Sequence, residues 1–256
     1  MNAPPRTLWL GLGTSLVAAL LWLSPHSPIA LDRADSAVLA GRVEEAASRY
    51  DEVARVGLTA GMRREALRRG ALLYGLELGQ AGEAIARLER LIPLVKGPAE
   101  RAELRDLQAR LYQDQGRYTL AARQWTLAWA EQAEAARLVA AAGAWERAGD
   151  DGRAWDTWIW VGAVCPERVA ESTLGRAHLT LAAGQVQDAL ALYERAERQA
   201  RDGDLRSVAR LGAVTCLERL GDLDEAIAGL DQAEIPDEAL DARLERIYRR
   251  RGERDL

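Results

Sequence analysis

The stretch GRYTLAARQWTLA, residues 116–128, contains the pattern that decides the fold of this chain. Gly116 is followed by a small residue five positions later (Ala121), a bulky residue four positions after that (Trp125), and another small residue three positions further on (Ala128). Spacings of three and four residues place side chains on one face of an α-helix. The stretch therefore predicts a helix that begins just after Gly116 and buries one narrow face.

The same pattern occurs six times along the chain. Its glycines are separated by 38, 37, 33, 35 and 37 residues, and they are Gly41, Gly79, Gly116, Gly149, Gly184 and Gly221. The alanines that follow them are Ala46, Ala84, Ala121, Ala154, Ala189 and Ala226. The bulky residues are Tyr50, Leu88, Trp125, Trp158, Tyr193 and Leu230. The last residues of the pattern are Val53, Leu91, Ala128, Val161, Ala196 and Ala233. A repeat of this period indicates a solenoid.

Each repeat contains a second amphipathic stretch upstream of its glycine. Before Gly116 this stretch carries Leu104, Leu107, Leu111 and Tyr112. We expect the glycine to end this first helix, because it adopts a positive φ without steric cost. Each repeat is then a hairpin of two helices, which buries its apolar face by stacking on its neighbours.

The composition agrees with an all-helical chain. Hydrophobic residues make up 48% of the 256 residues and phenylalanine is absent, so residues that favour strands are few. The formal net charge is −5, whereas a nucleic-acid-binding protein carries a basic footprint. We therefore expect an all-α protein that does not bind nucleic acid.

The repeat resembles the tetratricopeptide repeat. In that family a unit of about 34 residues has a turn of the type Gly-Asp/Arg-Tyr-x-Glu-Ala, followed by an aromatic residue, an alanine and often a proline. Gly116, Arg117 and Tyr118 match this turn, the segment GDLDEAI at residues 221–227 matches it nearly as well, and Pro166 stands where a family repeat ends. The resemblance covers about residues 30–250. It implies an all-α superhelical solenoid of about six helix hairpins.

The chain divides into four segments on this reading. Residues 1–24 form a signal anchor or signal peptide, residues 25–36 a linker or the start of the first repeat, and residues 37–236 the repeat array. Residues 237–256 form a capping helix and tail, whose apolar positions are Leu240, Leu244, Ile247 and Tyr248. A terminal unit of a solenoid needs such a cap, because its outer face must be polar.

The N-terminal segment contains an uncharged, mostly apolar run at residues 8–23, LWLGLGTSLVAALLWL, which follows Arg6. Such a run predicts a hydrophobic helix that acts as a secretory signal or a signal anchor. Trp9 and Trp22 lie near its two ends, as interfacial aromatics of a spanning helix do. We favour an uncleaved single-pass anchor in the bacterial inner membrane, with the repeats in the periplasm. A cleaved signal that releases a soluble periplasmic protein remains the alternative.

The sequence offers few groups for catalysis. His26 and His178 are the two histidines and suggest no shared site, and Cys165 and Cys216 are the two cysteines. We interpret both cysteines as small core residues rather than a disulfide, because their repeats are not adjacent. No phosphate-binding loop, nucleophile motif or metal-ligand spacing is present. We therefore expect neither an enzyme nor a cofactor, metal or small-molecule substrate.

The resemblance implies a binding groove lined by the first helices. The residues that it places there are Arg69, Leu73, Leu76, Asp106, Arg110, Gln113, Val139, Gly143, Glu146, Leu174, His178, Leu181, Leu211, Thr215 and Glu218. Family members that bind chaperones hold a terminal carboxylate with lysine and asparagine, but Lys96 and Asn2 are the chain's single examples of each. The apolar residues of the set favour a helical or extended segment of a protein partner.

Two tryptophans lie off the buried stripe. Trp155 and Trp160 fall between its positions in the fourth repeat, and exposed aromatic residues are enriched at protein interfaces. We expect them to contribute to a partner or self-association surface. Replacing Trp160 with alanine is then expected to weaken association and to leave thermal unfolding nearly unchanged.

Together these features predict a non-enzymatic, membrane-tethered scaffold that binds protein partners through its repeats. It resembles the anchored tetratricopeptide-repeat proteins of the bacterial envelope. A structural subunit of a larger envelope complex is the alternative that the sequence leaves open.

Overall fold

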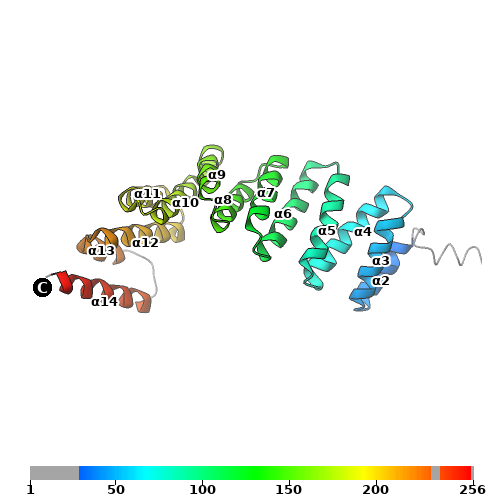
Figure 1. Ribbon diagram of the computed structural model, residues 1–256, viewed down its shortest axis with the longest axis horizontal. Coiled ribbons are helices and arrows are strands. Elements are labelled where there is room, and N and C mark those ends of the chain that lie inside the picture. The colour runs from blue at the N-terminus through cyan, green and yellow to red at the C-terminus, as the bar shows by residue number, and fades with distance from the viewer. Residues whose placement is uncertain (1–28, 232–236, 255–256) are drawn as a thin grey trace, which may run out of the picture. The chain divides into compact units, whose positions relative to one another are not determined.

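The computed structural model describes residues 29–231 and 237–254, and within these residues all regular structure is helical (Figure 1). The predicted hydrophobic helix at residues 8–23 lies outside the described residues. Across the part of the chain that the structure describes, no helix has the length and apolar character needed to cross a membrane.

The chain forms two compact units, Met1–Gly116 and Arg117–Leu256. The first unit contains α2 (Ala30–Leu39), α3 (Val43–Val56), α4 (Ala60–Leu72), the π-helical turn η1 (Leu73–Glu77), α5 (Ala81–Leu91), the 3₁₀ turn η2 (Ile92–Leu94) and α6 (Pro98–Asp114). The second unit contains α7 (Tyr118–Glu131), α8 (Ala135–Arg147), α9 (Asp151–Val164), η3 (Pro166–Arg168), α10 (Val169–Ala182), α11 (Val186–Gln199), α12 (Gly203–Leu220), α13 (Leu223–Leu230) and α14 (Asp237–Arg254). The even-numbered helices are the first helices of the predicted hairpins, and the odd-numbered helices are the second.

The six predicted turn glycines adopt the left-handed conformation. Their φ values are 71° at Gly41, 61° at Gly79, 70° at Gly116 and Gly149, 79° at Gly184 and 93° at Gly221. After five of them the next amide donates to a carbonyl near the end of the first helix; for example, Asp150 N donates to Trp145 O at 3.1 Å. Such a left-handed ending favours glycine. The prediction of six glycine turns is confirmed.

The stripe that follows each glycine is buried. All six alanines of the pattern have an exposed fraction of 0%, and the six bulky residues are exposed by 7% or less. The final stripe residues that the structure describes are also buried, while Ala233 lies outside the described residues. Burial of these faces between consecutive helices supplies the main stabilising free energy of each unit.

Three bulky residues pack against a glycine of the next first helix. A β-carbon at Gly175 would lie 2.2 Å from Trp158 Cε2, and one at Gly212 would lie 2.2 Å from Tyr193 Cε1. At Gly70 it would lie 3.6 Å from the Tyr50 β-carbon. Each of these glycines precedes its turn glycine by nine residues. The rings of Trp158 and Tyr193 therefore occupy the space that a side chain on the next repeat would need, whereas the Tyr50 contact with Gly70 is at an ordinary van der Waals distance.

A π-helical turn at Leu73–Glu77 shifts the register at the end of the second repeat's first helix. Its hydrogen bonds include one from Leu78 N to Leu73 O at 3.1 Å. The turn places Leu73 in the core with an exposed fraction of 6%, whereas its neighbour Leu72 is 40% exposed. The prediction that Leu73 lines an open groove is therefore wrong.

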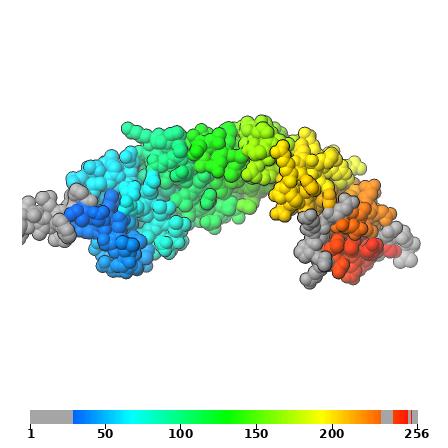
Figure 2. All heavy atoms as spheres, turned by 180° about the vertical axis from the view of Figure 1, so that it is seen from behind, coloured from blue at the N-terminus to red at the C-terminus, as the bar shows by residue number. Residues whose placement is uncertain are grey.

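The last described helix, α14, packs against the end of the repeat array. Ile247 has an exposed fraction of 0%, and Leu240 and Leu244 pack beside it against Leu230 and Val214. Figure 2 shows the red α14 against the orange α13. The predicted capping helix is confirmed, with Tyr248 of its apolar set exposed.

The two cysteines are free and buried in the second unit. Cys216 belongs to the cluster around Tyr193, and Cys165 is 6% exposed. Burial raises the pKa of both thiols. Both residues are small core residues, as predicted.

Candidate protein-binding face

The first helices α8 and α10 bring two predicted groove residues together in the second unit. Glu146 of α8 accepts a hydrogen bond from the Trp158 indole nitrogen. His178 of α10 is exposed, and its ring centroid lies 5.6 Å from that of Tyr193. Desolvation by the surrounding side chains lowers the pKa of His178, and the charge of Glu146 opposes this effect. We call this surface of α8 and α10 the first-helix face.

The other predicted residues on these two helices differ in access. Gly143 has open space where a β-carbon would stand. Val139 and Leu181 are half-buried and pack at the edges of the cores below. Leu174 is only 8% exposed and belongs to the core around Tyr193. The expectation that Leu174 faces a partner is therefore wrong, because its side chain packs between helices.

The predicted groove residues of α12 are covered by α14. Glu218 is buried and accepts a hydrogen bond from Arg243 Nε at 2.7 Å. Thr215 Oγ1 accepts another from Arg243 Nη2 at 2.7 Å, and Leu211 packs at the edge of the cluster around Ile247. Glu218 and Thr215 bind the chain's own last helix, which corrects the expectation that they are free for a partner.

In the first unit, Arg69 is held by carboxylates from two helices. It forms ion pairs with Asp35 of α2 and with Glu65 of α4, the latter at 2.7 Å from Nε. The Tyr50 hydroxyl donates to the same Asp35 carboxylate. Burial opposes ionisation of Asp35, but the hydrogen bonds from Arg69 and Tyr50 outweigh it and lower its pKa. Arg69 therefore ties α2 to α4 and carries little free charge.

The remaining predicted residues of the first unit are open in part. Leu76 is 69% exposed. On α6, Arg110 is exposed, and Asp106 and Gln113 are half-buried.

Trp155 and Trp160 are half-buried rather than exposed. Trp160 packs edge-on against Trp129, with ring centroids 4.4 Å apart. Trp155 lies under the Arg176 guanidinium, whose central carbon is 4.7 Å from the ring centroid. Removing Trp160 is therefore expected to destabilise the fold, which corrects the expectation of an unchanged thermal transition. Their role in partner binding stays a prediction.

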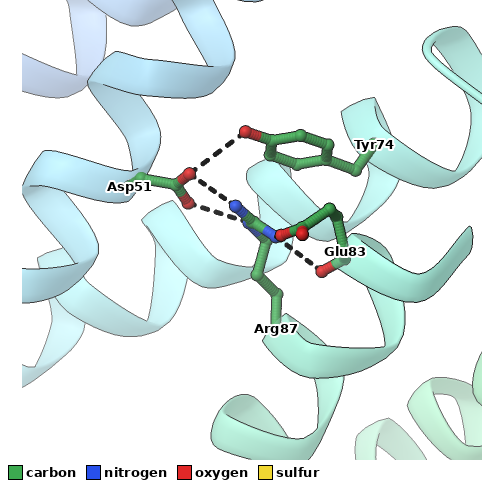
Figure 3. Close-up of polar contacts among 4 residues, drawn as sticks. All are labelled: Asp51, Tyr74, Glu83 and Arg87. Carbon is green, nitrogen blue, oxygen red and sulfur yellow. Dashed lines mark hydrogen bonds and ion pairs between the residues drawn. The ribbon is translucent and has the colours of Figure 1, made fainter. Parts of the chain in front are cut away.

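A polar cluster joins the second helices α3 and α5 of the first unit (Figure 3). Arg87 is 7% exposed and donates to Asp51 from Nε at 2.8 Å and to Glu83 from Nη1 at 2.8 Å. The Tyr74 hydroxyl donates to Asp51 at 3.1 Å. The adjacent cavity of about 540 Å³ is lined by both acidic and basic side chains. We assign the cluster a structural role, because its buried guanidinium is already paired.

No protein-family model matches the sequence, and no curated protein does. Solved structures share its architecture. YrrB, described as a TPR protein with an unusual peptide-binding site, has 15% identity and a TM-score of 0.51, over 71% of this chain and 91% of YrrB. The pilF protein of Pseudomonas aeruginosa has 18% identity and a TM-score of 0.51, over 75% of this chain and 87% of pilF. The Naa15/Naa10 complex bound to HypK-THB gives 17% identity and a TM-score of 0.65, over 84% of this chain and 32% of the matched chain.

The chain has the tetratricopeptide-repeat fold. At these sequence identities, the comparisons establish only the fold of this tetratricopeptide-repeat chain.

Sequence reasoning missed several exposed or partnered residues of this tetratricopeptide-repeat chain. Leu39 is 90% exposed and Leu72 is 40% exposed, both on first helices of the first unit. Asp35 was missed as the partner of Arg69. The pattern alone gave no signal for Leu72, because the π-helical turn changes the register by one residue.

Proposed function

We propose that this protein is a non-enzymatic scaffold that binds protein partners through the first-helix face. The observation that carries the proposal is the meeting of Glu146 and His178, from consecutive first helices, on an accessible surface above the Trp158 and Tyr193 rings. Such a surface combines a carboxylate, an imidazole and aromatic edges, which suits the backbone amides and apolar side chains of a peptide segment.

The partner segment is helical or extended rather than a free C-terminus. A terminal-carboxylate clamp needs cationic and amide side chains, and the single lysine and asparagine of the chain are Lys96 and Asn2. The acidic Glu146 on the face also disfavours a terminal carboxylate beside it. We therefore propose recognition of an internal segment.

Site-specific photocrosslinking in cells tests the face directly. A photoreactive benzoylphenylalanine at position 178 is expected to form discrete adducts with a partner. The matched control is position 198, since Arg198 is an exposed residue of the second helix α11. Equal adducts from both positions, or none from position 178, would overturn the proposal. Adducts in fixed stoichiometry would favour a structural subunit over a recruiting scaffold.

We also propose that residues 8–23 tether the repeats to the bacterial inner membrane, with the repeats in the periplasm. The support is the uncharged apolar run after Arg6. A tether raises the effective concentration of partners in the same membrane. Mass spectrometry of the N-terminus of the purified protein tests this proposal. A mature start between residues 24 and 35 would replace the anchor with a cleaved signal and a soluble periplasmic adaptor.

A further inference from the structure

Arg176 of α10 carries a half-buried guanidinium group over the side chain of Trp155. Its Nε is buried and has no hydrogen-bond partner, and the group stacks over the Trp155 ring of α9. Among the described residues, no ion pair joins Arg176 to a carboxylate. The side chains three and four positions away on α10 are Ser172, Thr173, Leu179 and Thr180, and none is acidic.

Other arginines that are largely buried in this protein do have carboxylate partners. Arg87 pairs with Asp51 and Glu83, and Arg210 pairs with Glu197 at 2.5 Å. A cation that is partly removed from water needs such a partner to recover its lost hydration. Half-buried arginines without a carboxylate partner, such as Arg63, donate to a backbone carbonyl instead, whereas the guanidinium of Arg176 has neither kind of acceptor among the described residues.

A second positive charge adds to the imbalance at this site. Arg195 is an exposed residue of α11, and no carboxylate lies three or four positions from it on that helix. Desolvation lowers the pKa of Arg176, and the charge of Arg195 lowers it further. An anion between the two groups would relieve both effects.

The apolar side chain of Ile159 lies beside Trp155 at this site. Ile159 is 46% exposed and follows Trp155 by four residues, so the two side chains share one face of α9. Arg176 and His178 are two residues apart, which corresponds to about 200° around a helix. The site therefore lies on a different surface from the first-helix face.

We propose that Trp155, Arg176 and Arg195 form a docking site for an acidic side chain of a protein partner, with Ile159 contacting an adjacent apolar residue. The carboxylate accepts hydrogen bonds from the guanidinium groups, and the partly desolvated setting makes such charged bonds stronger than in water. This inference rests on the proposed function, since it assumes a protein partner, but it concerns a second surface.

Selection from a random peptide library on the full-length protein tests the site. Peptides recovered by the unmodified chain are expected to be enriched in aspartate or glutamate next to an apolar residue. A recovered peptide is expected to bind about tenfold more weakly to Arg176→Gln, as loss of a charged hydrogen bond predicts. Arg195→Gln, at an exposed position, is expected to weaken binding in the same direction without altering the fold. The matched control is Arg123→Gln, an exposed arginine of α7, which is expected to leave the affinity unchanged.

Charge reversal separates recognition from a structural role. Arg195→Glu is expected to weaken the acidic peptide further and to improve binding of the same peptide with lysine in place of glutamate. The inference would be overturned if the recovered peptides showed no enrichment in acidic residues. It would also be overturned if acidic peptides bound equally well to the unmodified chain and to both arginine variants. Either result would leave the proposed scaffold function standing. Recovery of no binding peptide at all would overturn the inference together with the proposed function.

Discussion

Gly175 leaves the space that the Trp158 ring fills, and Gly212 does the same for Tyr193. At the scale of residues, the packing of neighbouring helices depends on the combined size of two contacting side chains rather than on either one alone. Where the preceding bulky residue is Leu88, the equivalent position of the next first helix is Leu107, which is only half-buried. The rings of Trp158 and Tyr193 therefore face a glycine, Ala140 stands at the equivalent position after Trp125, and the larger Leu107 follows the smaller Leu88.

Gly175→Ala is expected to destabilise the second unit by about 1–3 kcal/mol, the usual cost of overpacking a core. The added carbon would lie 2.2 Å from Trp158, and the ring is held between two helices. Thermal or urea unfolding measures the change. The control is Gly143→Ala, where the space is open and the better helix propensity of alanine is expected to stabilise by about 1 kcal/mol. Equal melting temperatures for the two variants would contradict the packing argument.

Asp35 makes the stability of the first unit depend on pH. Its carboxylate pKa is lower in the folded chain than in the unfolded chain, because Arg69 and Tyr50 donate to the ionised form. Its contribution is therefore complete above the unfolded pKa of about 3.9 and is lost as the pH falls through the folded pKa.

Urea unfolding between pH 2 and pH 6 is expected to show this loss, and Asp35→Asn is expected to reduce the pH dependence. Asp32→Asn, at an exposed acidic position of the same helix, serves as the control. An unchanged pH profile in Asp35→Asn would show that the ion pair with Arg69 does not contribute to stability.

At the scale of whole helices, the position of α14 depends on its contacts with residues of α12. Its Arg243 reaches both Glu218 and Thr215 of α12, which are 25 and 28 residues earlier in the chain. The helical period of residues 237–256 predicted a capping helix, whereas the resemblance to tetratricopeptide repeats placed these α12 residues in an open groove. The periodicity of a helix predicts that it forms and which of its faces is buried. The surface against which it packs depends on the residues of the other helices.

Arg243→Ala is expected to destabilise the docking of α14 by about 1–3 kcal/mol, because the buried Glu218 carboxylate loses its closest donor. Hydrogen exchange of the α14 amides measures the effect. Arg249→Ala removes an exposed i,i+4 pair with Glu245 and is expected to cost at most about 0.5 kcal/mol. Equal exchange in both variants would rule out a role for Arg243 in holding the helix.

At the scale of the molecule, the described helices pack mainly against their neighbours in chain order, within two separate compact units. Stability in such a solenoid is a sum of local terms. A destabilising substitution in one unit is therefore expected to affect the helices near it before it affects the other unit.

Hydrogen exchange of Gly175→Ala is expected to accelerate in α9, α10 and α11 and to remain unchanged in α2 to α5. The physical reason is that Trp158 and Gly175 join α9 to α10, whereas the first unit has its own core around Tyr50. Uniform acceleration across both units would indicate a single cooperative structure and contradict this expectation.

The helices, the six glycine turns and the buried stripe could all be predicted from the amino-acid sequence. These features depend on local chemistry: glycine reaches a positive φ, and a period of three to four residues puts side chains on one helix face. The sequence also predicted the cap, since α14 has the same period.

Which residues are available to a partner depended on the tertiary packing. The π-helical turn buried Leu73, α14 covered Glu218, and Arg176, which pairs with no carboxylate among the described residues, lies over Trp155. Each outcome depends on atoms brought from other helices or on a register shift of one residue. Helical periodicity specifies which face of a helix is buried, but the partner of each side chain depends on the helix that packs against it.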